Sequence, residues 1–506
     1  MKYSTSSLRK LVAHYQDIVR LSEINSMLGW DLNVNLPPKG THDRAKQSAY
    51  LTALVTDKWR DPKFYRCIEK AHSDGKQLTI QEQAMLRNIE WSGRYYWKVP
   101  KSLVVKFAET TSEAFMVWQQ AKQDDDFKAF QPYLEKIVVL CRKTADHLGY
   151  QENRYDALLN LYEQGLTTNK MKRIFSVLKK ELTQLLKKIT ASDTSSPVVQ
   201  RFISESYRFD NKRQEQLAHF VLRKMGYDFQ AGKLDISPHP FTTQLGRRDV
   251  RITTKYTRHD FRDSLTSSIH EGGHALYEQG VNEAFALTPL GSGVSLGIHE
   301  SQSRFWENIV GRSREFLSFL TPMLQAFYPE HLADIREDDL FHLMNHVMPG
   351  RIRIEADEVT YNFHILLRFE LEEALVNEKI KIVDLPEVWR EKMKKYLQVM
   401  PETDRDGVLQ DVHWSYGSFG YFPTYTLGNL YAAQFTRAMK QELDIPELLK
   451  SGNLGTILSW LRTNIHQYGS LYWPDELIKR VTGEELNPRY FLDYLKQKFM
   501  SSTYGS

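Results

Sequence analysis

The sequence predicts a mainly α-helical protein that carries one small β-hairpin. Across much of the 506-residue chain, hydrophobic residues recur at the i, i+3, i+4, i+7 spacing of amphipathic helices. Glycine and proline are modest at 26 and 18 residues, which argues against a β-sandwich and against long disordered tracts. In residues 239–257, two β-prone runs flank the turn residue Gly246 and predict a hairpin.

Two helical stripes stand out in the N-terminal half, and we expect both to be buried because an apolar stripe on a helix normally faces a core. Thr168 is the expected N-cap of the helix that carries the second stripe, which begins at Met171. The segment ASDTSSPVV, residues 191–199, has the composition of a loop. We expect it to join two helices rather than to divide two lobes. The stripes are Leu8, Leu11, Val12, Tyr15, Ile18 and Val19, and Met171, Ile174, Phe175, Leu178, Leu182, Leu185, Leu186 and Ile189.

Composition excludes several classes of protein. The net charge of +4 is mild and no Lys/Arg block occurs, so we expect no nucleic-acid partner. Two cysteines, Cys67 and Cys141, exclude a cysteine-based zinc site and argue against a disulfide framework. No apolar run reaches about 18 residues and the N-terminus has no signal-peptide core, so we expect no membrane span and a cytoplasmic location.

The segment SSIHEGGHALYEQG, residues 267–280, carries the clearest chemical signal. His270 and His274 are four residues apart, which on a helix places both imidazoles on one face, about 5–6 Å apart at Cβ. Glu271 follows the first histidine and is placed to act on a water molecule activated by the metal. This is the HExxH arrangement of two zinc ligands and one general base.

The two central glycines of this segment, Gly272 and Gly273, need an explanation, since each costs about 1 kcal/mol in a helix interior. We expect them to permit close approach, either of substrate or of a neighbouring helix. The helix is expected to start near Asp263 or Ser264 and to end at Gly280.

A catalytic zinc needs a third protein ligand. Glu278 lies eight residues beyond His270, about 12 Å along a helix axis, so it is too far. The segment 297–311, GIHESQSRFWENIVG, offers Glu300, with His299 as its rival. Neighbouring helical residues point about 100° apart, so one of these two should reach the ion. We prefer Glu300.

Chance is the alternative explanation, because HExxH patterns occur in many unrelated proteins. The segment HLMNH has the same histidine spacing at His342 and His346 but no glutamate after the first histidine. We interpret those two as ordinary core or surface residues.

Further motifs in chain order make the pattern far more specific, and together they resemble the carboxypeptidase Taq family of metallocarboxypeptidases. The resemblance implies a mainly α fold with two lobes around a deep active-site groove and a small β-sheet or hairpin near the zinc helix. It also implies removal of single C-terminal residues from peptide substrates with broad specificity, zinc or sometimes cobalt as the metal, and a homodimer. The motifs are HPF (239–241), DVRIT (249–253), HEGGH (270–274), HESQ (299–302), IRIEAD (352–357) and GVLQDVHW (407–414).

On this basis we expect residues 1–506 to form a single peptidase domain. The helices of residues 1–190 would form part of the groove wall or a lid. Residues 200–506 would carry the metal site and the substrate-binding motifs.

The resemblance also indicates candidates for catalysis. Glu271 would take a proton from the attacking water and pass it to the leaving amine. His413 and Tyr421 resemble a histidine and tyrosine pair of related helical metallopeptidases, and would donate hydrogen bonds to the tetrahedral intermediate. The alternative for Tyr421 is ordinary packing, since the chain has 26 tyrosines.

A carboxypeptidase must also bind a free carboxylate, which suits the two-pronged guanidinium of arginine. Arg353 is the first candidate, unless it pairs with Glu355 or Asp357. Arg251 is the second, unless Asp249 holds it. His239, between two prolines, is a further candidate for contact with substrate.

The β-prone stretch of residues 242–256 could also bind substrate, since an edge strand pairs with a peptide backbone whatever its side chains. It could equally be a structural hairpin. Two rival functions remain at this point. One is an oligopeptidase with the same zinc chemistry but internal cleavage, and the other is a non-catalytic helical peptide-binding protein.

Overall fold

A computed structural model describes residues 2–75, 78–192, 200–202 and 207–500. It is mainly helical with one small sheet, which confirms the predicted fold class. The chain forms two compact units, each assembled from separate stretches. Unit 1 comprises Met1–Trp97, Ser196–Met344 and Tyr431–Leu486, and unit 2 comprises Lys98–Ser195, Asn345–Leu430 and Asn487–Ser506. The expected single peptidase domain remains a prediction.

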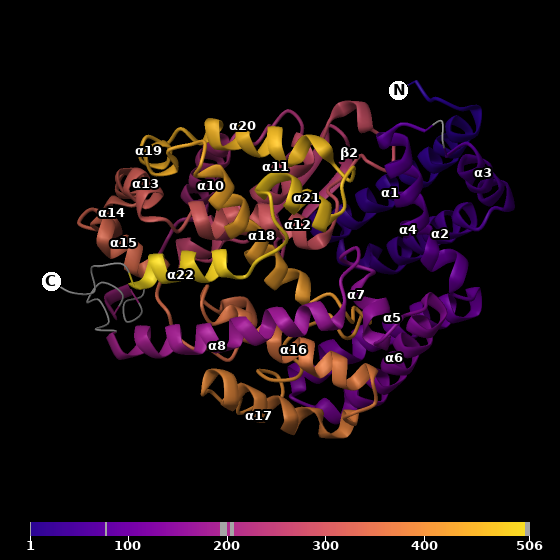
Figure 1. The fold of residues 1–506 in the computed structure, drawn as a ribbon. Coiled ribbons are helices and arrows are strands. Elements are labelled where there is room, and N and C mark those ends of the chain that lie inside the picture. The colour runs from indigo at the N-terminus through magenta and orange to yellow at the C-terminus, as the bar shows by residue number, and fades with distance from the viewer. Residues whose placement is uncertain (1, 76–77, 193–199, 203–206, 501–506) are drawn as a thin grey trace. The chain divides into compact units, whose positions relative to one another are not determined.

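Unit 1 is built around a 20-residue helix, α11 (Phe261–Gly280), which packs against α10, α12 and the sheet. Figure 1 labels these elements along the chain. The other helices of this unit are α1 (Ser6–Val34), η1 (Pro38–Gly40), α2 (Thr41–Trp59), α3 (Pro62–Ser73), α4 (Ile80–Lys98), α10 (Asn211–Met225), η3 (Glu283–Phe285), α12 (Leu296–Arg304), η4 (Phe305–Val310), α13 (Arg314–Phe327), α14 (Pro329–Leu332), α15 (Glu337–Met344), α19 (Ile445–Lys450), α20 (Leu454–Asn464), η7 (His466–Tyr468) and α21 (Pro474–Thr482).

The sheet of unit 1 has three strands in the order β1-β3-β2. Strands β2 (Thr242–Gly246) and β3 (Asp249–Thr254) pair antiparallel, so the predicted hairpin is confirmed. Strand β1 (Leu234–Ile236) pairs parallel to β3 and was not predicted, because three residues are too few to show an alternating pattern. Strand β2 therefore lies at an edge of the sheet, and its residues also pack against α1 and α11.

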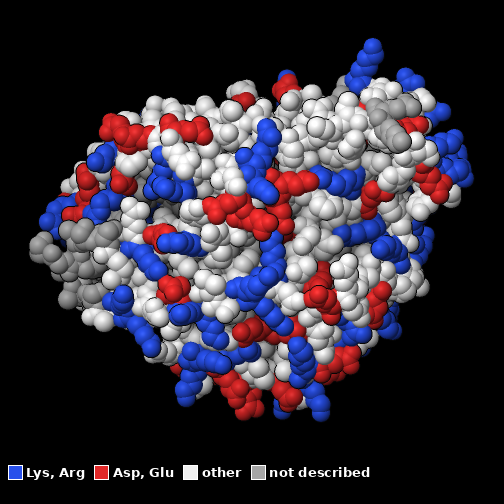
Figure 2. All heavy atoms as spheres, in the orientation of Figure 1, with Lys and Arg blue, Asp and Glu red and all other residues white. Residues whose placement is uncertain are grey.

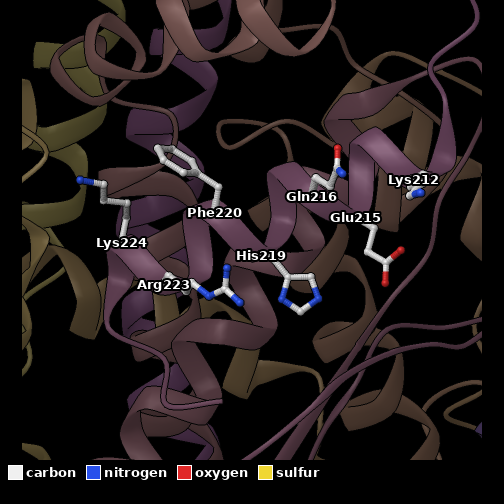
Figure 3. Close-up of a pocket in the computed structure, with 7 residues that line it drawn as sticks. All are labelled: Lys212, Glu215, Gln216, His219, Phe220, Arg223 and Lys224. Carbon is white, nitrogen blue, oxygen red and sulfur yellow. The ribbon is translucent and has the colours of Figure 1, made fainter. Parts of the chain in front are cut away.

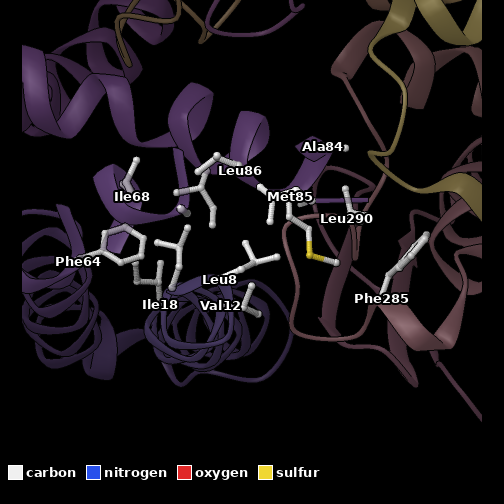
Figure 4. Close-up of a cluster of buried hydrophobic side chains, with 14 of the residues drawn as sticks. Leu8, Val12, Ile18, Phe64, Ile68, Ala84, Met85, Leu86, Phe285 and Leu290 are labelled. Carbon is white, nitrogen blue, oxygen red and sulfur yellow. The ribbon is translucent and has the colours of Figure 1, made fainter. Parts of the chain in front are cut away.

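A hydrophobic core joins the N-terminal helices of unit 1 to the chain that follows α11 (Figure 4). Leu8 and Val12 of α1 are buried with Phe64 of α3 and Met85 of α4, and Leu290 joins them from the later segment. Full burial of such a side chain contributes about 1.5–3 kcal/mol. Four of the six residues of the predicted N-terminal stripe thus form core, Tyr15 packs against it, and Val19 is only partly buried.

Two predicted helix starts were wrong by a few residues. Helix α11 begins after Asp260, whose carboxylate accepts a hydrogen bond from the Arg262 amide, so Asp263 lies inside the first turn. Helix α8 begins at Thr168 itself, and the Thr167 hydroxyl accepts a hydrogen bond from the Lys170 amide. In both places a capping side chain one to three residues earlier satisfies the free amide groups. The end of α11 at Gly280 is as predicted.

Unit 2 is also helical, and its buried positions include the second predicted stripe, from Met171 to Ile189, except Leu186, which is partly exposed. Most of the predicted 191–199 loop lies outside the described residues. The helices of unit 2 are α5 (Lys101–Asp124), α6 (Phe127–Leu148), α7 (Arg154–Leu159), α8 (Thr168–Ser192), η5 (Arg353–Glu355), α16 (Tyr361–Val376), η6 (Ile382–Asp384), α17 (Leu385–Leu397) and α22 (Arg489–Met500). Helix α18 (Pro423–Met439) begins in unit 2 and ends in unit 1.

The charged residues of the face drawn in Figure 2 are interspersed, with Lys and Arg beside Asp and Glu. Both cysteines, Cys67 and Cys141, are free. Within the described part of the chain, every helix is too short or too polar to cross a bilayer.

Candidate metal centre and active site

Helix α11 presents His270 and His274 on one face, as their spacing predicts. Their ring centroids lie 4.9 Å apart. The opposite side of the helix is anchored by Leu265, Ile269 and Leu276, which are all buried. This anchoring fixes the direction in which the two imidazoles point.

The two central glycines let other helices approach α11 closely. A Cβ added at Gly273 would lie 2.7 Å from the Gln302 carbonyl oxygen and 2.7 Å from Ser303 Cα, both in the backbone of α12. A Cβ at Gly272 would lie 2.5 Å from a methyl group of Leu222 on α10. The neighbouring helices, rather than substrate, therefore explain both glycines.

Close packing at Gly273 brings α12, and with it Glu300, to the two histidines. Glu300 Oε2 lies 3.8 Å from His270 Nε2 and 3.5 Å from His274 Nε2. One ligand atom of each of these three residues falls within 4.8 Å of the others, a group able to hold a metal ion. No other such group occurs among the described residues, and the His342 and His346 pair is not part of one.

Arg304, one helical turn beyond Glu300, orients the Glu300 carboxylate. Arg304 Nε donates a hydrogen bond of 2.7 Å to Glu300 Oε1. The second oxygen, Oε2, is thereby left facing the histidine rings. Arg304 is not among the residues predicted from the sequence, although its i+4 spacing from Glu300 is a usable signal.

The charge states of His274 and Glu300 fit a divalent metal. Burial lowers the pKa of His274 to about 3, so its ring is neutral and offers a lone pair. Burial would raise the pKa of Glu300, but Arg304 and the two histidines outweigh it and hold the pKa well below its usual range. A neutral imidazole and an ionised carboxylate are the forms that bind such an ion.

Glu307 lies behind His270, on a π-helical turn, η4, that follows α12. Its Oε2 is 2.8 Å from His270 Nδ1, and its Oε1 accepts a hydrogen bond of 3.0 Å from Arg312. Burial would lower the pKa of His270, but Glu300 and Glu307 raise it above its usual value. Glu307 thus fixes the ring through Nδ1 and leaves Nε2 toward Glu300.

A third histidine, His299, is partly buried and lies behind His274. The two Nδ1 atoms are 2.6 Å apart, and His299 Nε2 is 2.9 Å from Glu278 Oε1. Gly293 makes room for this arrangement, since a Cβ there would lie 2.8 Å from His299 Cδ2. His299 and Glu278, which are not predicted to be ligands, therefore support the ligand candidate His274 from behind.

Glu271, the expected general base, is buried beside the ligand candidates and is held by strand β2. The Thr242 hydroxyl lies 2.6 Å from Glu271 Oε2. Burial raises the pKa of Glu271 above its usual value, which favours a carboxylate able to accept and release a proton. Thr242 was not predicted, because nothing in the sequence shows that β2 passes along α11.

Arg353, the first candidate for binding the substrate carboxylate, belongs to unit 2 and is buried. It pairs with Asp411, through Nε at 3.0 Å and Nη2 at 2.7 Å, and not with Glu355 or Asp357. Its Nη1 donates to the Tyr361 hydroxyl at 3.1 Å. Arg368 donates to the other oxygen of Asp411 at 2.7 Å. Two guanidinium groups thus share a single carboxylate.

His413 and Tyr421 also lie in unit 2, with ring centroids 5.3 Å apart. His413 Nε2 is 3.2 Å from the hydroxyl of Tyr425, which the sequence analysis missed. Burial lowers the pKa of His413 to about 4, so its ring is neutral. A neutral imidazole with one N–H can donate a hydrogen bond without carrying charge.

The two remaining candidates have different surroundings. Arg251, on β3, makes two hydrogen bonds of 2.8 Å to Asp249, which is the structural pairing considered as its alternative. His239 is exposed, and its carbonyl oxygen accepts a hydrogen bond of 2.6 Å from the Ser237 hydroxyl. Among the described residues, neither Arg251 nor His239 forms a hydrogen bond or ion pair with the metal-ligand candidates.

A separate pocket lies on the outer face of α10 (Figure 3). One side of this helix lines it, including Lys212, His219, Phe220 and Arg223. It contains none of the candidate ligands, so it is not the candidate active site.

Comparison with known proteins agrees with this geometry. The profile of the carboxypeptidase Taq (M32) metallopeptidase family matches residues 10–499. Thermostable carboxypeptidase 1 of Pyrococcus furiosus is 42% identical over 500 residues, which cover 98% of this chain and 99% of that protein. Carboxypeptidase 1 of Bacillus subtilis is 38% identical over 497 residues, covering 97% and 96%.

Solved structures agree as well. A Pyrococcus furiosus carboxypeptidase matches with a TM-score of 0.94 at 41% identity, and the match covers 98% of this chain and 100% of that chain. The family profile and these identities extend over nearly the whole sequence. The chain therefore belongs to the carboxypeptidase Taq (M32) family and is a metallocarboxypeptidase that acts with a divalent metal.

Proposed function

We propose that this protein is a zinc-dependent carboxypeptidase that releases single C-terminal residues from peptides with broad specificity. The observation that carries the proposal is the convergence of His270, His274 and Glu300, whose ligand atoms lie within 4.8 Å of one another. Two imidazoles and one carboxylate are a common ligand set of catalytic zinc sites. Zinc is preferred to cobalt. A homodimeric state and a cytoplasmic location belong to the proposal as expectations.

Zinc bound by these residues would supply a Lewis acid that polarises the scissile carbonyl and acidifies water. Glu271 would accept the proton of the attacking water at its carboxylate, held in place by Thr242. It would then deliver that proton to the nitrogen of the leaving amine. The neutral His413 and the hydroxyl of Tyr421 would donate hydrogen bonds to the oxygen that gains negative charge.

Arg353 is proposed to bind the terminal carboxylate of the substrate. Its support is a charge imbalance, since Arg353 and Arg368 share Asp411 and leave one positive charge in excess among the three groups. Burial holds the pKa of the nearby His364 well below its usual value, so this ring adds no charge. A peptide carboxylate would balance the excess. Arg251 and His239 are weaker candidates for substrate contact.

Strand β2 is proposed to pair with the peptide backbone. It lies at an edge of the three-stranded sheet, and Thr242 at its start touches Glu271. Main-chain pairing would place the scissile bond without reading side chains, which suits broad specificity.

The decisive experiment measures release of a free amino acid from an N-blocked dipeptide, with and without a chelator. We expect chelator-sensitive release, and we expect Glu271→Gln to keep its metal but lose nearly all turnover. A C-terminally amidated peptide is the control. Its cleavage at an equal rate would favour the rival function, an internally cleaving oligopeptidase.

The role of Arg353 has its own test. Arg353→Ala should slow cleavage of peptides with a free carboxylate far more than residual cleavage of amidated peptides. An equal loss on both substrates would argue against carboxylate binding. Membership in a carboxypeptidase family favours an enzyme over a non-catalytic peptide-binding protein.

A further inference from the structure

The two proposed donors of unit 2 flank a short loop, residues 414–420, whose ends lie together. His413 precedes the loop and Tyr421 follows it. Inside it, the Gly417 amide donates to the Trp414 carbonyl at 3.0 Å, and the Ser418 amide donates to the His413 carbonyl at 3.0 Å. The relative position of the two donor side chains therefore depends on how the ends of this loop are held.

One buried carboxylate contacts both ends of the 414–420 loop. Glu372, on α16, has no exposed surface. Its Oε1 accepts a hydrogen bond of 2.8 Å from the indole N–H of Trp414. Its Oε2 accepts one of 2.8 Å from the Gly420 amide and one of 2.5 Å from the Tyr155 hydroxyl. Each oxygen thus holds a different end.

The far end of the loop is also pressed against α7, which carries Tyr155. Gly420 has φ +94, and a Cβ there would lie 2.7 Å from the backbone carbon of Leu158. Only glycine fits this conformation and this distance without displacement. The position of Gly420 is therefore fixed by Glu372 on one side and by α7 on the other.

A buried carboxylate is costly, and an apolar residue could fill the same space without that cost. Burial raises the pKa of Glu372 to about 7, because a charged carboxylate is less stable away from water. The three donors that converge on Glu372 offset this cost. Since two of them come from the ends of one loop, holding that loop explains why an acid stands there.

We infer that Glu372 is a positioning residue that fixes the spacing between His413 and Tyr421 by binding both ends of the 414–420 loop. The inference rests on the proposed roles of these two donors. Glu372 itself would touch neither substrate nor metal. Its loss should lower kcat, because misplacement by about 1 Å can cost about 100-fold in rate.

The test compares Glu372→Gln with Glu373→Gln. Glu373 is the next residue of α16 and is also buried, but it binds Lys379 at 2.7 Å and Lys172 at 3.2 Å, away from the loop. We expect Glu372→Gln to lower kcat at least 10-fold with KM changed less than 3-fold and metal content unchanged. Glu373→Gln should lower thermal stability about as much as Glu372→Gln does, but it should keep the wild-type kcat.

A double-mutant comparison separates this inference from the proposed function. In a His413→Ala/Tyr421→Phe background, which should itself have a low kcat, Glu372→Gln should lower kcat less than 3-fold further. A low kcat in that background together with a normal kcat for Glu372→Gln alone would overturn the inference and leave the donors in place. A normal kcat in that background would instead refute the donor roles, and the inference with them.

If Glu372→Gln does not fold, Glu372→Asp provides the second variant. It keeps the charge but is one methylene too short to reach both ends of the loop. We again expect a lower kcat with KM nearly unchanged. Wild-type kcat for a folded Glu372→Asp protein would overturn the inference.

Discussion

His274 Nδ1 lies 2.6 Å from His299 Nδ1, and this contact couples the tautomers of the two rings. If His274 Nε2 offers its lone pair to a metal, its Nδ1 carries the proton and donates to His299. The proton of His299 is then on Nε2, where it donates to Glu278 Oε1 at 2.9 Å. In this arrangement every ring nitrogen of His274 and His299 donates or accepts, which is typical of residues behind metal ligands.

Removal of this support should weaken metal binding. We expect His299→Ala to reduce metal affinity about 10- to 100-fold, because His274 loses the partner that orients it. Competition with a chromogenic chelator measures the affinity directly, without an activity assay. His364→Ala, which removes a buried histidine of unit 2, should leave the affinity unchanged. Equal affinity for His299→Ala and wild type would contradict this prediction.

The two glycines of α11 should respond differently to alanine. Gly273→Ala should destabilise the protein by about 1–3 kcal/mol and weaken metal binding, because the new methyl group meets the backbone of α12, which carries Glu300. Gly272→Ala meets a methyl group of Leu222, which can move, and gains about 1 kcal/mol of helix propensity. Thermal unfolding and metal affinity of the two variants check this prediction. The prediction is contradicted if Gly273→Ala and Gly272→Ala have the same unfolding temperature and the same metal affinity.

Thr242 should matter for turnover rather than for substrate binding. Thr242→Val keeps the shape of the side chain but removes the hydroxyl that lies 2.6 Å from Glu271 Oε2. A hydrogen bond to a charged group is worth about 1.5–3 kcal/mol, so kcat should fall about 10- to 100-fold. Thr243→Val is the matched control, since successive residues of a strand point to opposite faces. Steady-state kinetics of both variants check this prediction. If Thr242→Val changed KM alone and left kcat unchanged, a role of Thr242 in holding Glu271 for catalysis would be excluded.

Asp411 should be the main electrostatic support of the buried pair Arg353 and Arg368. Asp411→Asn leaves both guanidinium groups without a carboxylate and should cost about 3–5 kcal/mol in the free energy of unfolding at pH 7. Asp404→Asn, which weakens a more exposed pair with Arg390, should cost about 1 kcal/mol or less. Urea unfolding measures both values.

The same carboxylate should make stability depend on pH. Burial would raise the pKa of Asp411, but Arg353 and Arg368 outweigh it and hold the pKa well below its usual range. The unfolded chain binds this proton near pH 3.9, so the contribution is complete above about pH 5 and is lost as the pH falls toward the folded pKa. Between pH 5 and pH 3 the wild type should therefore lose more stability than Asp411→Asn. If the free energy of unfolding fell equally with pH in the wild type and in Asp411→Asn, Asp411 would be excluded as the source of this pH dependence.

Features that depend on local spacing could be predicted from the sequence. His270 and His274 share a helix face because four residues make about one turn. The hairpin at Gly246 follows from two β-prone runs on either side of a turn, and α11 ends at Gly280 as expected. Helix starts were less certain, because a capping side chain such as Asp260 acts through a single hydrogen bond.

Contacts between distant segments could not be predicted in the same way. Asp411 lies 58 residues from Arg353, and Thr242 lies 29 residues from Glu271. The acids nearest to Arg353 in the chain are Glu355 and Asp357, but the fold pairs it with Asp411 instead.

The sequence by itself determined the helical class and the shared helix face of His270 and His274, because both depend on residue type and helical period, and it offered Glu300 as a third ligand candidate. The tertiary structure decided which groups stand behind them: Glu307, His299 with Glu278, and Thr242. Those partners meet only when α11, α12, η4 and β2 pack together, and packing depends on the whole set of side chains rather than on spacing within one segment.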